Sequence, residues 1–254
     1  MNALPTQPPS DLPATGRIDI HSHMIPGIDD GCQDIDESLA CVRRLIELGY
    51  AGSICTPHVV PAEYPQNQPR HIEAWTRQLQ QAIDEAGLTY RLWTGGELRL
   101  SADVVSWMQT HGVPTLAGSR CVLMDFWEAK WPKWVASSVE WLISSRYQPI
   151  LAHPERLPAA RDLDRRLADL ATQGVWLQGN FACLTGREGF AADQMVRKLL
   201  SEERYQFMAL DMHGPQTLEE RLDGISLVEA EFGPEVVEYL TSDAPRQLIW
   251  GLGT

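Results

Sequence analysis

Cysteine is scarce in this sequence and never occurs as a closely spaced pair. The 254 residues include five cysteines, an odd number, and no C-x-x-C spacing. This pattern argues against a disulfide framework and against a zinc site built from thiolates. A cysteine-based phosphatase is also excluded, because it needs an arginine six residues after its nucleophile. The residues at that offset are Ser38, Glu47, Pro61, Trp127 and Gly189. The scattered thiols fit a reducing compartment, so we expect a cytoplasmic protein.

Long apolar runs and an excess of positive charge are also missing. No segment approaches the roughly 20 apolar residues that cross a membrane, so we expect no stable membrane insertion. The net charge is −13 at pH 7, whereas nucleic-acid binding needs clustered lysine and arginine to neutralise phosphates. We therefore expect no nucleic-acid partner. A small anionic group held by a few local cations remains compatible with this charge.

The motifs of several common enzyme classes are absent from the sequence. There is no G-x-S-x-G turn, no G-K-[ST] phosphate loop and no G-x-G-x-x-G after a predicted strand. A serine hydrolase, a nucleoside triphosphatase or a Rossmann dehydrogenase would therefore lack its principal part.

Most of the chain alternates between short β-like runs and helix-like runs. Residues 1–16 are rich in proline and lack a basic start and an apolar run, so we expect a flexible tail and not a signal peptide. About seven β-α units follow, with helical spacing of apolar residues at 36–49, for example. Such alternation implies parallel strands joined by right-handed crossovers. It predicts one α/β domain over residues 17–254, arranged more simply as a closed barrel than as an open sheet.

Histidines and carboxylates fall at the ends of the predicted strands. The segment IDIHSHMIPGIDDG places His21 and His23 two residues apart in a strand, where both side chains point to the same face. The carboxyl ends of parallel barrel strands open on one face, so side chains from different strands meet there. The residues at these ends are His21, His23, His58, Glu97, Asp125, His153, Asp211 and His213.

This set of side chains predicts a metal centre. A single histidine at a strand end is more often a hydrogen-bonded structural residue than a ligand, but five of the seven histidines fall at corresponding ends. A mixture of imidazole and carboxylate without thiolate suits manganese, iron or zinc. The set exceeds what one ion binds, so we expect about two or three divalent ions, with manganese first and iron or zinc as alternatives.

An ordered series of segments resembles a known family. DIHSHMIPGIDDG, CTPHVVP, GGELRL, LAHPER, LQGN and LDMH are similar to segments of the bacterial metal-dependent protein-tyrosine phosphatases of the polymerase-and-histidinol-phosphatase (PHP) superfamily. These CpsB/YwqE-like enzymes are linked to capsular and extracellular polysaccharide. The resemblance covers the chain from Arg17 to SDAPRQLIWG. It implies a single-domain, distorted seven-stranded (β/α) barrel of the PHP type with three divalent metals.

The resemblance also implies a set of ligands for each metal. These are His21, His23 and Asp211 for the first metal, the bridging Glu97 with Asp125 and His153 for the second, and Asp30, His58 and His213 for the third. Asp125 departs from the family, which usually has glutamate there, and its shorter side chain would loosen or reposition the second metal. Leu210 and Met212 also depart, and we expect them to make the rim of the site more apolar.

Arg156 is the residue that we expect to bind the phosphate group. It lies three residues beyond His153, and a planar guanidinium matches two phosphate oxygens. The alternative interpretation is a surface ion pair with Glu155. Metals about 3.5–4 Å apart lower the pKa of a bound water and hold the attacking and leaving oxygens. The expected reaction is therefore hydrolysis of a phosphomonoester by metal-activated water.

Three tryptophans follow Asp125 closely, at Trp127, Trp131 and Trp134. One interpretation is an aromatic platform for a phosphotyrosine ring or a partner. The other is ordinary packing of the next helix. The sequence leaves both open.

The resemblance implies a protein-tyrosine phosphatase that removes phosphate from the tyrosine-rich tail of a polysaccharide-assembly kinase. One alternative is a small-molecule phosphatase of the histidinol-phosphate type, which shares the metal ligands but needs a small, closed pocket. Another is a catalytically weak, metal-binding regulatory protein. The complete ligand set together with Arg156 argues against a loss of turnover.

Overall fold

Nine strands among the described residues form two parallel sheets. The computed structural model describes residues 12–158 and 162–250. The strands are β1 (Arg17–Ser22), β2 (Tyr50–Cys55), β3 (His58–Val59), β4 (Arg91–Thr94), β5 (Glu97–Arg99), β6 (Cys121–Asp125), β7 (Gln148–Ala152), β8 (Trp176–Asn180) and β9 (Phe207–Ala209). Three form a sheet in the order β1-β2-β4, and six form a second sheet in the order β3-β5-β6-β7-β8-β9. All the strand pairs are parallel, which confirms the α/β class.

The expected count of seven strands is not confirmed, because two predicted strands are interrupted. Residues 56–57 separate β2 from β3, and residues 95–96 separate β4 from β5. The first interruption contains Pro57, which has no N–H to donate to a neighbouring strand. The second consists of two glycines, and a Cβ atom on either would lie 2.8 Å from a neighbouring side chain. A proline therefore marks the first interruption, and close packing of two glycines marks the second.

The two sheets approach each other where β1 passes the segment after β9. Ser22 forms an isolated parallel bridge with Met212. The His23 N–H donates to the Met212 carbonyl at 2.9 Å, and the Asp211 N–H donates to the His21 carbonyl at 3.0 Å. These bonds bring the first and last strand ends of the chain together.

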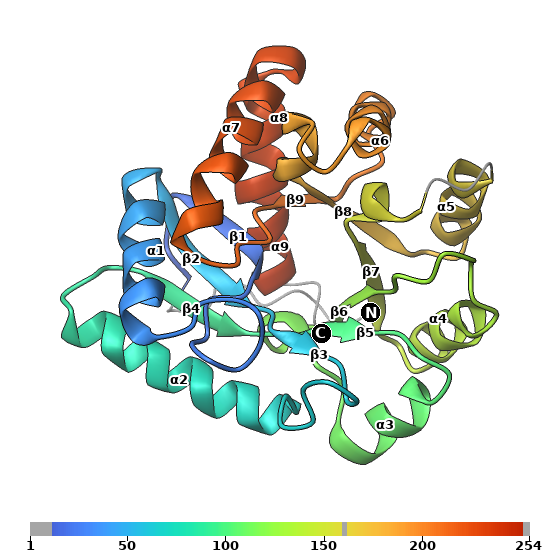
Figure 1. The fold of residues 1–254 in the computed structure, drawn as a ribbon, viewed down its shortest axis with the longest axis horizontal. Coiled ribbons are helices and arrows are strands. Elements are labelled where there is room, and N and C mark those ends of the chain that lie inside the picture. The colour runs from blue at the N-terminus through green and yellow to red at the C-terminus, as the bar shows by residue number, and fades with distance from the viewer. Residues whose placement is uncertain (1–11, 159–161, 251–254) are drawn as a thin grey trace.

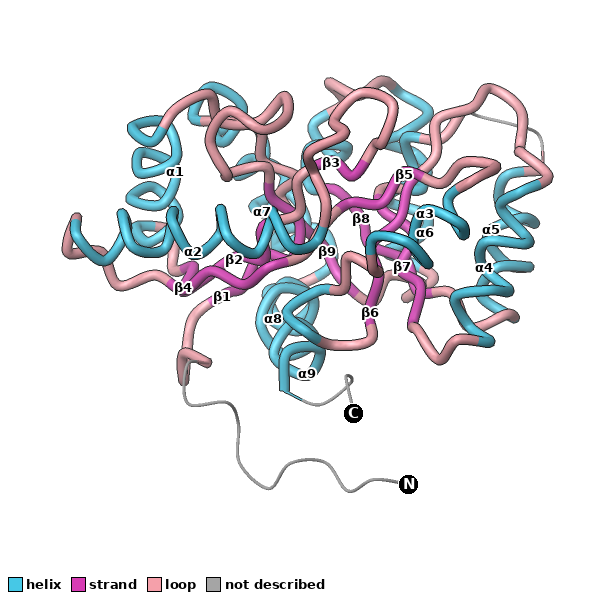
Figure 2. The backbone as a smooth tube through the Cα atoms, turned by 90° about the horizontal axis from the view of Figure 1, so that it is seen from below, coloured by secondary structure: helices cyan, strands magenta, loops and turns pink. Residues whose placement is uncertain are grey.

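The helices surround the strands (Figure 1). They are α1 (Ile35–Glu47), α2 (Pro69–Glu85), α3 (Val104–His111), α4 (Trp134–Ser144), α5 (Leu163–Thr172), α6 (Phe190–Ser201), α7 (Pro215–Phe232), α8 (Pro234–Glu238) and α9 (Ala244–Trp250), with short helical segments η1 (Leu116–Gly118), η2 (Pro154–Arg156), η3 (Phe181–Thr185) and η4 (Tyr239–Asp243). Figure 2 shows the strands crossing the middle of the molecule, with α8 and α9 on the opposite side from β3 and β5. None of the described helices is long and apolar enough to cross a bilayer.

Helix α1 illustrates how the sequence sets the limits of an element. The side chain of Asp34 caps its start by accepting a hydrogen bond from the Glu37 N–H at 2.9 Å. Asp36 and Glu37 place negative charge in the first turn, which the helix dipole favours. The chain leaves the helix at Gly49, whose φ of 81° suits glycine. The helix predicted at 36–49 is thus confirmed to within two residues at each end.

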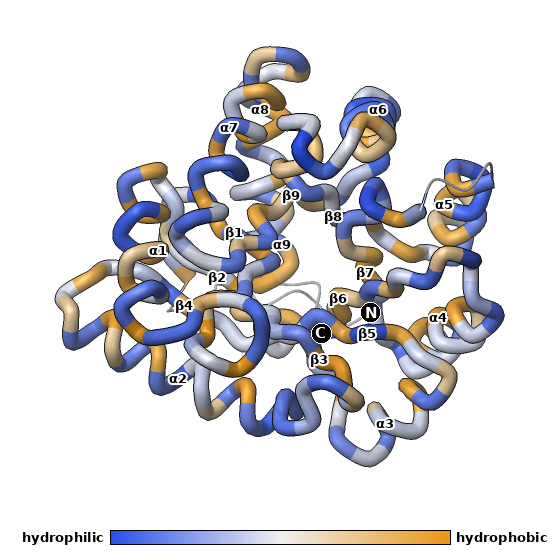
Figure 3. Tube along the Cα trace, in the orientation of Figure 1, coloured by the Kyte–Doolittle hydropathy of each residue, from blue (hydrophilic) through white to orange (hydrophobic). Residues whose placement is uncertain are grey.

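Two apolar layers enclose the strands. Along β6, Cys121 and Leu123 belong to a smaller inner cluster, whereas Val122 and Met124 belong to a larger outer cluster. This alternation follows from the period of two in a strand. Leu248 of α9 belongs to the inner cluster and closes it at one end. Hydrophobic and hydrophilic positions also alternate along the outer helices (Figure 3), as expected for helices with one buried face.

The segment preceding β1 is held by the last helix. Of the expected flexible tail at 1–16, residues 1–11 lie outside the described residues. In residues 12–16, the carbonyl groups of Pro13 and Gly16 accept hydrogen bonds from the Arg246 guanidinium of α9. Leu12 packs against the inner cluster. The described part of this segment is therefore anchored to the domain.

Gly224 of α7 provides a test of packing behind the strands. A Cβ atom at this position would lie 2.1 Å from the Phe181 carbonyl oxygen of η3. Alanine gains about 1 kcal/mol over glycine in a helix, but overpacking against backbone costs about 1–3 kcal/mol, and the backbone here has little freedom to move. We expect Gly224→Ala to lower the free energy of unfolding by ~1–2 kcal/mol in urea denaturation. The control Ser226→Ala, at an exposed position of α7, should be neutral or slightly stabilising, and an equally stable Gly224→Ala would contradict the packing argument.

Candidate metal centre

The expected ligands lie at strand ends or in loops on one side of the sheets. His21 is in β1 and His23 directly follows it, His58 begins β3, Glu97 begins β5, Asp125 ends β6, His153 directly follows β7, Asp211 and His213 follow β9, and Asp30 lies in the loop before α1. His21, Asp125 and His153 thus lie at or directly after the carboxyl ends of strands, as predicted, whereas His58 and Glu97 are the first residues of the short strands that follow the interruptions.

All the expected ligands except Asp125 belong to three compact groups. Within each group, one ligand atom per residue lies within 4.8 Å of the others. The groups are His21, His23 and Asp211, then His21, Glu97 and His153, and finally His23, Asp30, His58 and His213. The first group equals the expected first ligand set, and the third equals the expected third set with His23 added. His21 and His23 are each shared by two groups, so the groups form one continuous cluster.

The atoms of the first group point at a common position. His21 Nε2 and His23 Nε2 lie 3.2 Å apart, and Asp211 Oδ1 lies 3.4 Å from both. Two imidazole nitrogens and a carboxylate oxygen are the donors that a divalent transition metal prefers.

A buried carboxylate oxygen beside this group gives an independent test of the fit. Glu97 Oε2 is buried and makes no hydrogen bond among the described residues. It nevertheless lies 3.5 Å from His21 Nε2, 3.6 Å from His23 Nε2 and 2.8 Å from His58 Nδ1. An unsatisfied buried oxygen among imidazole nitrogens is costly unless a cation is bound. The donor set therefore fits divalent metal.

Two hydrogen bonds orient the first two histidines. His21 Nδ1 lies 2.9 Å from Gln178 Oε1 of β8, and His23 Nδ1 lies 2.9 Å from Asp29 Oδ2. Asp29 also accepts from the backbone N–H of Gly31 and of His58, each at 3.0 Å. When Nδ1 donates to these acceptors, Nε2 keeps its lone pair for a metal.

The sequence analysis missed these orienting residues. Asp29 is the other aspartate of the pair in GIDDG, and Gln178 and Asn180 are polar positions in the strand VWLQGN. Two polar side chains spaced by two residues at the end of an otherwise apolar strand are a usable indication of a site on that face.

Two of the expected ligands have strained backbone conformations. His153 has a φ of 31° and Asp211 a φ of 50°, in the left-handed region that residues with a Cβ atom seldom adopt. Such conformations persist where surrounding structure imposes them, and they concentrate at functional sites. Both residues turn the chain away from a strand end directly into the cluster.

Asp125 belongs to none of the three groups. Its Oδ2 accepts a hydrogen bond from the indole N–H of Trp127, and its Oδ1 is buried without a hydrogen bond. Burial, together with the charge of Glu97, raises the pKa of Asp125 to about 7. The short side chain is thus held at the edge of the cluster by its neighbouring indole.

The remaining charges of the cluster compensate one another. Burial opposes protonation of His58, but the carboxylates of Asp30 and Glu97 outweigh it and raise the pKa of His58 to about 12. Burial alone would raise the pKa of Glu97, but the neighbouring His21 and other histidines hold it well below its ordinary value. The cluster therefore stabilises carboxylates in their charged form, which is the form that binds metal.

Arg156 lies against the cluster and contacts Asp211. Its Nη1 donates to Asp211 Oδ2 at 2.9 Å, and its Nε lies 3.5 Å from Glu188. The alternative interpretation, a surface ion pair with Glu155, is wrong. Glu155 is buried and accepts hydrogen bonds from the Asn180 N–H at 2.6 Å and the Tyr205 hydroxyl at 2.8 Å.

Asp211 divides its two oxygens between two tasks. Oδ1 faces the histidines, whereas Oδ2 accepts from Arg156 and, at 2.8 Å, from the side-chain amide of Asn180. One oxygen thus remains available to a metal while the other is fixed by hydrogen bonds.

The rim of the site differs from the expectation. Leu210 and Met212 are fully buried, so the prediction that they make the rim more apolar is wrong. Trp131 and Trp134 pack against Phe126, with ring centroids 4.9 Å and 6.3 Å away. Trp127 instead stays exposed beside the cluster. The packing interpretation therefore holds for two of the three tryptophans.

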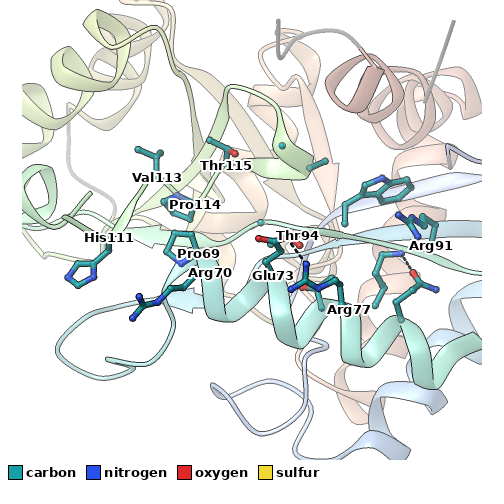
Figure 4. Close-up of a pocket in the computed structure, with 17 residues that line it drawn as sticks. Pro69, Arg70, Glu73, Arg77, Arg91, Thr94, His111, Val113, Pro114 and Thr115 are labelled. Carbon is teal, nitrogen blue, oxygen red and sulfur yellow. Dashed lines mark hydrogen bonds and ion pairs between the residues drawn. The ribbon is translucent and has the colours of Figure 1, made fainter. Parts of the chain in front are cut away.

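A larger cavity lies elsewhere in the molecule. It has a volume of about 590 Å³ and lies between α2, β4 and residues 111–118. Figure 4 shows Arg70 and Arg77 of α2, Arg91 of β4 and His111 around it. None of the expected ligands lines it, so it is separate from the metal centre. The pocket at the cluster itself is smaller, about 170 Å³.

Comparisons with known proteins match the whole domain. The family model described as "Capsular polysaccharide synthesis, CpsB/CapC" matches residues 17–250. The tyrosine-protein phosphatase YwqE of Bacillus subtilis is 26% identical over 89% of both chains. The tyrosine-protein phosphatase CpsB of Streptococcus pneumoniae is 22% identical over 91% of this chain and 98% of its own.

Solved structures agree with this result. A structure from work on YwqE of B. subtilis and CpsB of S. pneumoniae, described as unique metal-dependent tyrosine phosphatases, aligns with a TM-score of 0.83 and 26% identity over 93% of this chain and 95% of that chain. The phosphotriesterase homology protein of Escherichia coli aligns at a TM-score of 0.57 with 11% identity, over 94% of this chain and 100% of that chain, and shares the fold alone. The chain belongs to the CpsB/CapC family of capsular polysaccharide synthesis proteins.

Proposed function

We propose that this chain is a metal-dependent phosphatase that hydrolyses phosphotyrosine in a protein and so controls capsular or extracellular polysaccharide synthesis. The observation that carries the proposal is the convergence of His21, His23 and Asp211 on one position, with Arg156 bound to the far oxygen of Asp211. Two kinds of relative support it, the named tyrosine-protein phosphatases and the metal-dependent tyrosine phosphatase structure.

The proposed ligands follow the three groups of side chains. They are His21, His23 and Asp211 for one metal, the shared Glu97 with His153 for a second, and Asp30, His58 and His213 for a third. Asp125 remains a predicted ligand of the second metal, and its buried, unbonded Oδ1 would serve that role while Oδ2 keeps the Trp127 indole. Divalent ions here, manganese first and iron or zinc as alternatives, would supply Lewis-acid charge to phosphoryl oxygens and lower the pKa of water.

The chain's own residues bind and orient the phosphate. Arg156 presents a planar guanidinium that matches two phosphate oxygens, and binding a substrate means exchanging Asp211 for the phosphate. Asn180 keeps its hydrogen bond to Asp211 Oδ2 during this exchange, so the carboxylate stays oriented. Gln178 and Asp29 hold the tautomers of His21 and His23.

The proposal includes the finer features that the resemblance implies. Counting β2 with β3 and β4 with β5 as two interrupted strands gives the seven-stranded PHP-type barrel, with residues 17–254 as one domain. The protein acts in the cytoplasm, and its partner is a phosphorylated polysaccharide-assembly tyrosine kinase. The small-molecule alternative is disfavoured because Trp127, 51% exposed, leaves the pocket beside the cluster open.

The first prediction concerns metal content. Purified protein should carry about two to three transition-metal ions per chain, and a chelator should abolish hydrolysis of a phosphotyrosine peptide until manganese is returned. Elemental analysis and peptide turnover measure the two quantities. Metal-free protein that gains no activity with added manganese would remove the metal-centre proposal, whereas bound metal without turnover would favour the regulatory alternative.

The second prediction separates the phosphate-binding residue from a ligand. Arg156→Ala should keep its metal while kcat/KM for an aryl phosphate falls by about 10²–10³, the scale for losing one charge-stabilising contact. His153→Ala should lose metal as well as rate, because an imidazole supplies a lone pair and a guanidinium cannot.

Arg165→Ala is the matched control for these variants. Arg165 is exposed on α5 and pairs with Asp162 and Asp169, so its loss should leave metal content and kcat/KM unchanged. Unchanged turnover in Arg156→Ala would remove this arginine from the mechanism, and full metal occupancy in His153→Ala would contradict the second ligand set.

A further inference from the structure

A small pocket adjoins the candidate metal centre next to the phosphate-binding arginine. Its volume is about 170 Å³, and it is lined by Phe126, Trp127, His153, Arg156, Leu157 and Pro158. A protein cavity of about 150 Å³ accommodates benzene. The pocket therefore has the size of one aromatic ring, with an expected metal ligand and the proposed phosphate clamp on one side and apolar side chains on the other.

Trp127 forms an exposed wall of this pocket. Its side chain is 51% exposed, whereas the two following tryptophans pack against Phe126. Three contacts hold the exposed indole in place. The indole N–H donates to Asp125 Oδ2, and the guanidinium groups of Arg99 and Arg156 lie 5.2 Å and 5.9 Å from the ring centroid. The ring is thus fixed by polar groups, while half of its side-chain surface stays exposed.

The neighbouring aspartate explains how the indole reaches this position. Asp125 lies two residues before Trp127, and its Oδ2 accepts the hydrogen bond of the indole N–H. Asp125 and Trp127 therefore act together to place an aromatic wall beside Arg156.

We propose that this pocket is the subsite for the aromatic ring of an aryl phosphate and that Trp127 determines the selectivity for it. The inference rests on the proposed function for the position of the phosphate at Arg156. A ring attached to that phosphate contacts the indole in an offset or edge-on arrangement and covers Leu157 and Pro158. A short alkyl group on the same phosphate makes none of these contacts, so the subsite distinguishes tyrosine phosphate from serine phosphate by contact area.

Binding of non-hydrolysable phosphonates tests the subsite apart from turnover. Phenylphosphonate and methylphosphonate carry the same anionic group, so the ratio of their dissociation constants, measured by calorimetry on the metal-loaded full chain, isolates the ring. We expect the wild-type protein to bind phenylphosphonate about tenfold more tightly. Trp127→Leu should reduce this preference to below about threefold, and Trp127→Phe, which keeps a ring face without the N–H, should retain most of it.

Trp131→Phe is the matched control, because Trp131 lies in the same segment without lining the pocket, and phenylalanine keeps an aromatic ring against Phe126. It should keep the wild-type preference, and thermal unfolding of each variant checks that the fold is retained. Equal affinities in the wild-type protein would overturn the subsite. The subsite would also be overturned if the preference for phenylphosphonate survived Trp127→Leu. Loss of that preference in Trp127→Phe or in Trp131→Phe would overturn it as well.

A parallel assay of phosphotyrosine-peptide hydrolysis separates this inference from the proposed function. Turnover by a wild-type protein that shows no preference for the phenyl group would remove the subsite and leave the phosphatase. A clear phenyl preference without any turnover would keep the subsite and refute the phosphatase.

Discussion

The rest of this structure depends on one constraint: buried carboxylates need positive charge beside them. Glu97 and Asp211 are each 1% exposed and lie among imidazoles. Carboxylates at this depth are stable only beside positive charge. The raised pKa of His58 reflects this need, which protonated histidines or bound cations beside neutral histidines would meet. The same packing thus serves both states of the cluster.

This constraint extends into the backbone. The orienting partners Asp29 and Gln178 bond to the far nitrogens of the histidines, and Asp29 also accepts from two backbone N–H groups. The loop that carries Asp29 folds so closely over β1 that a Cβ atom on Gly31 would lie 1.9 Å from the His23 carbonyl oxygen. These contacts couple the expected metal ligands to their hydrogen-bond partners and to the tight loop. A substitution in any one of them therefore shifts the others.

Local patterns in the sequence predicted most of the fold and most of the cluster. The alternation of β1 and the meeting of histidines from different strands follow from the period of strands and the geometry of parallel sheets. The break at 95–96 was not predictable, because it arises from close packing between distant segments, whereas Pro57 is a local feature of the break at 56–57. The position of the Asp125 side chain could not be predicted from the sequence either, because it depends on a hydrogen bond from the Trp127 indole. The burial of Leu210, directly after β9, was missed because it depends on contact with the distant strand β1, where Asp19 accepts a hydrogen bond from the Leu210 N–H.

The bonds between β1 and the end of the domain have a consequence for biosynthesis. Asp19 of β1 accepts a hydrogen bond from the Leu210 N–H, 191 residues later. Ribosomes add about 5–20 residues per second, so the first strand waits ~10–40 s for this partner to be made. During that time His21 and His23 have left the ribosome without the carboxylate of Asp211. The nascent chain thus contains both imidazoles before the carboxylate that completes their group. The last βα units therefore determine when a cation bound by these histidines becomes enclosed.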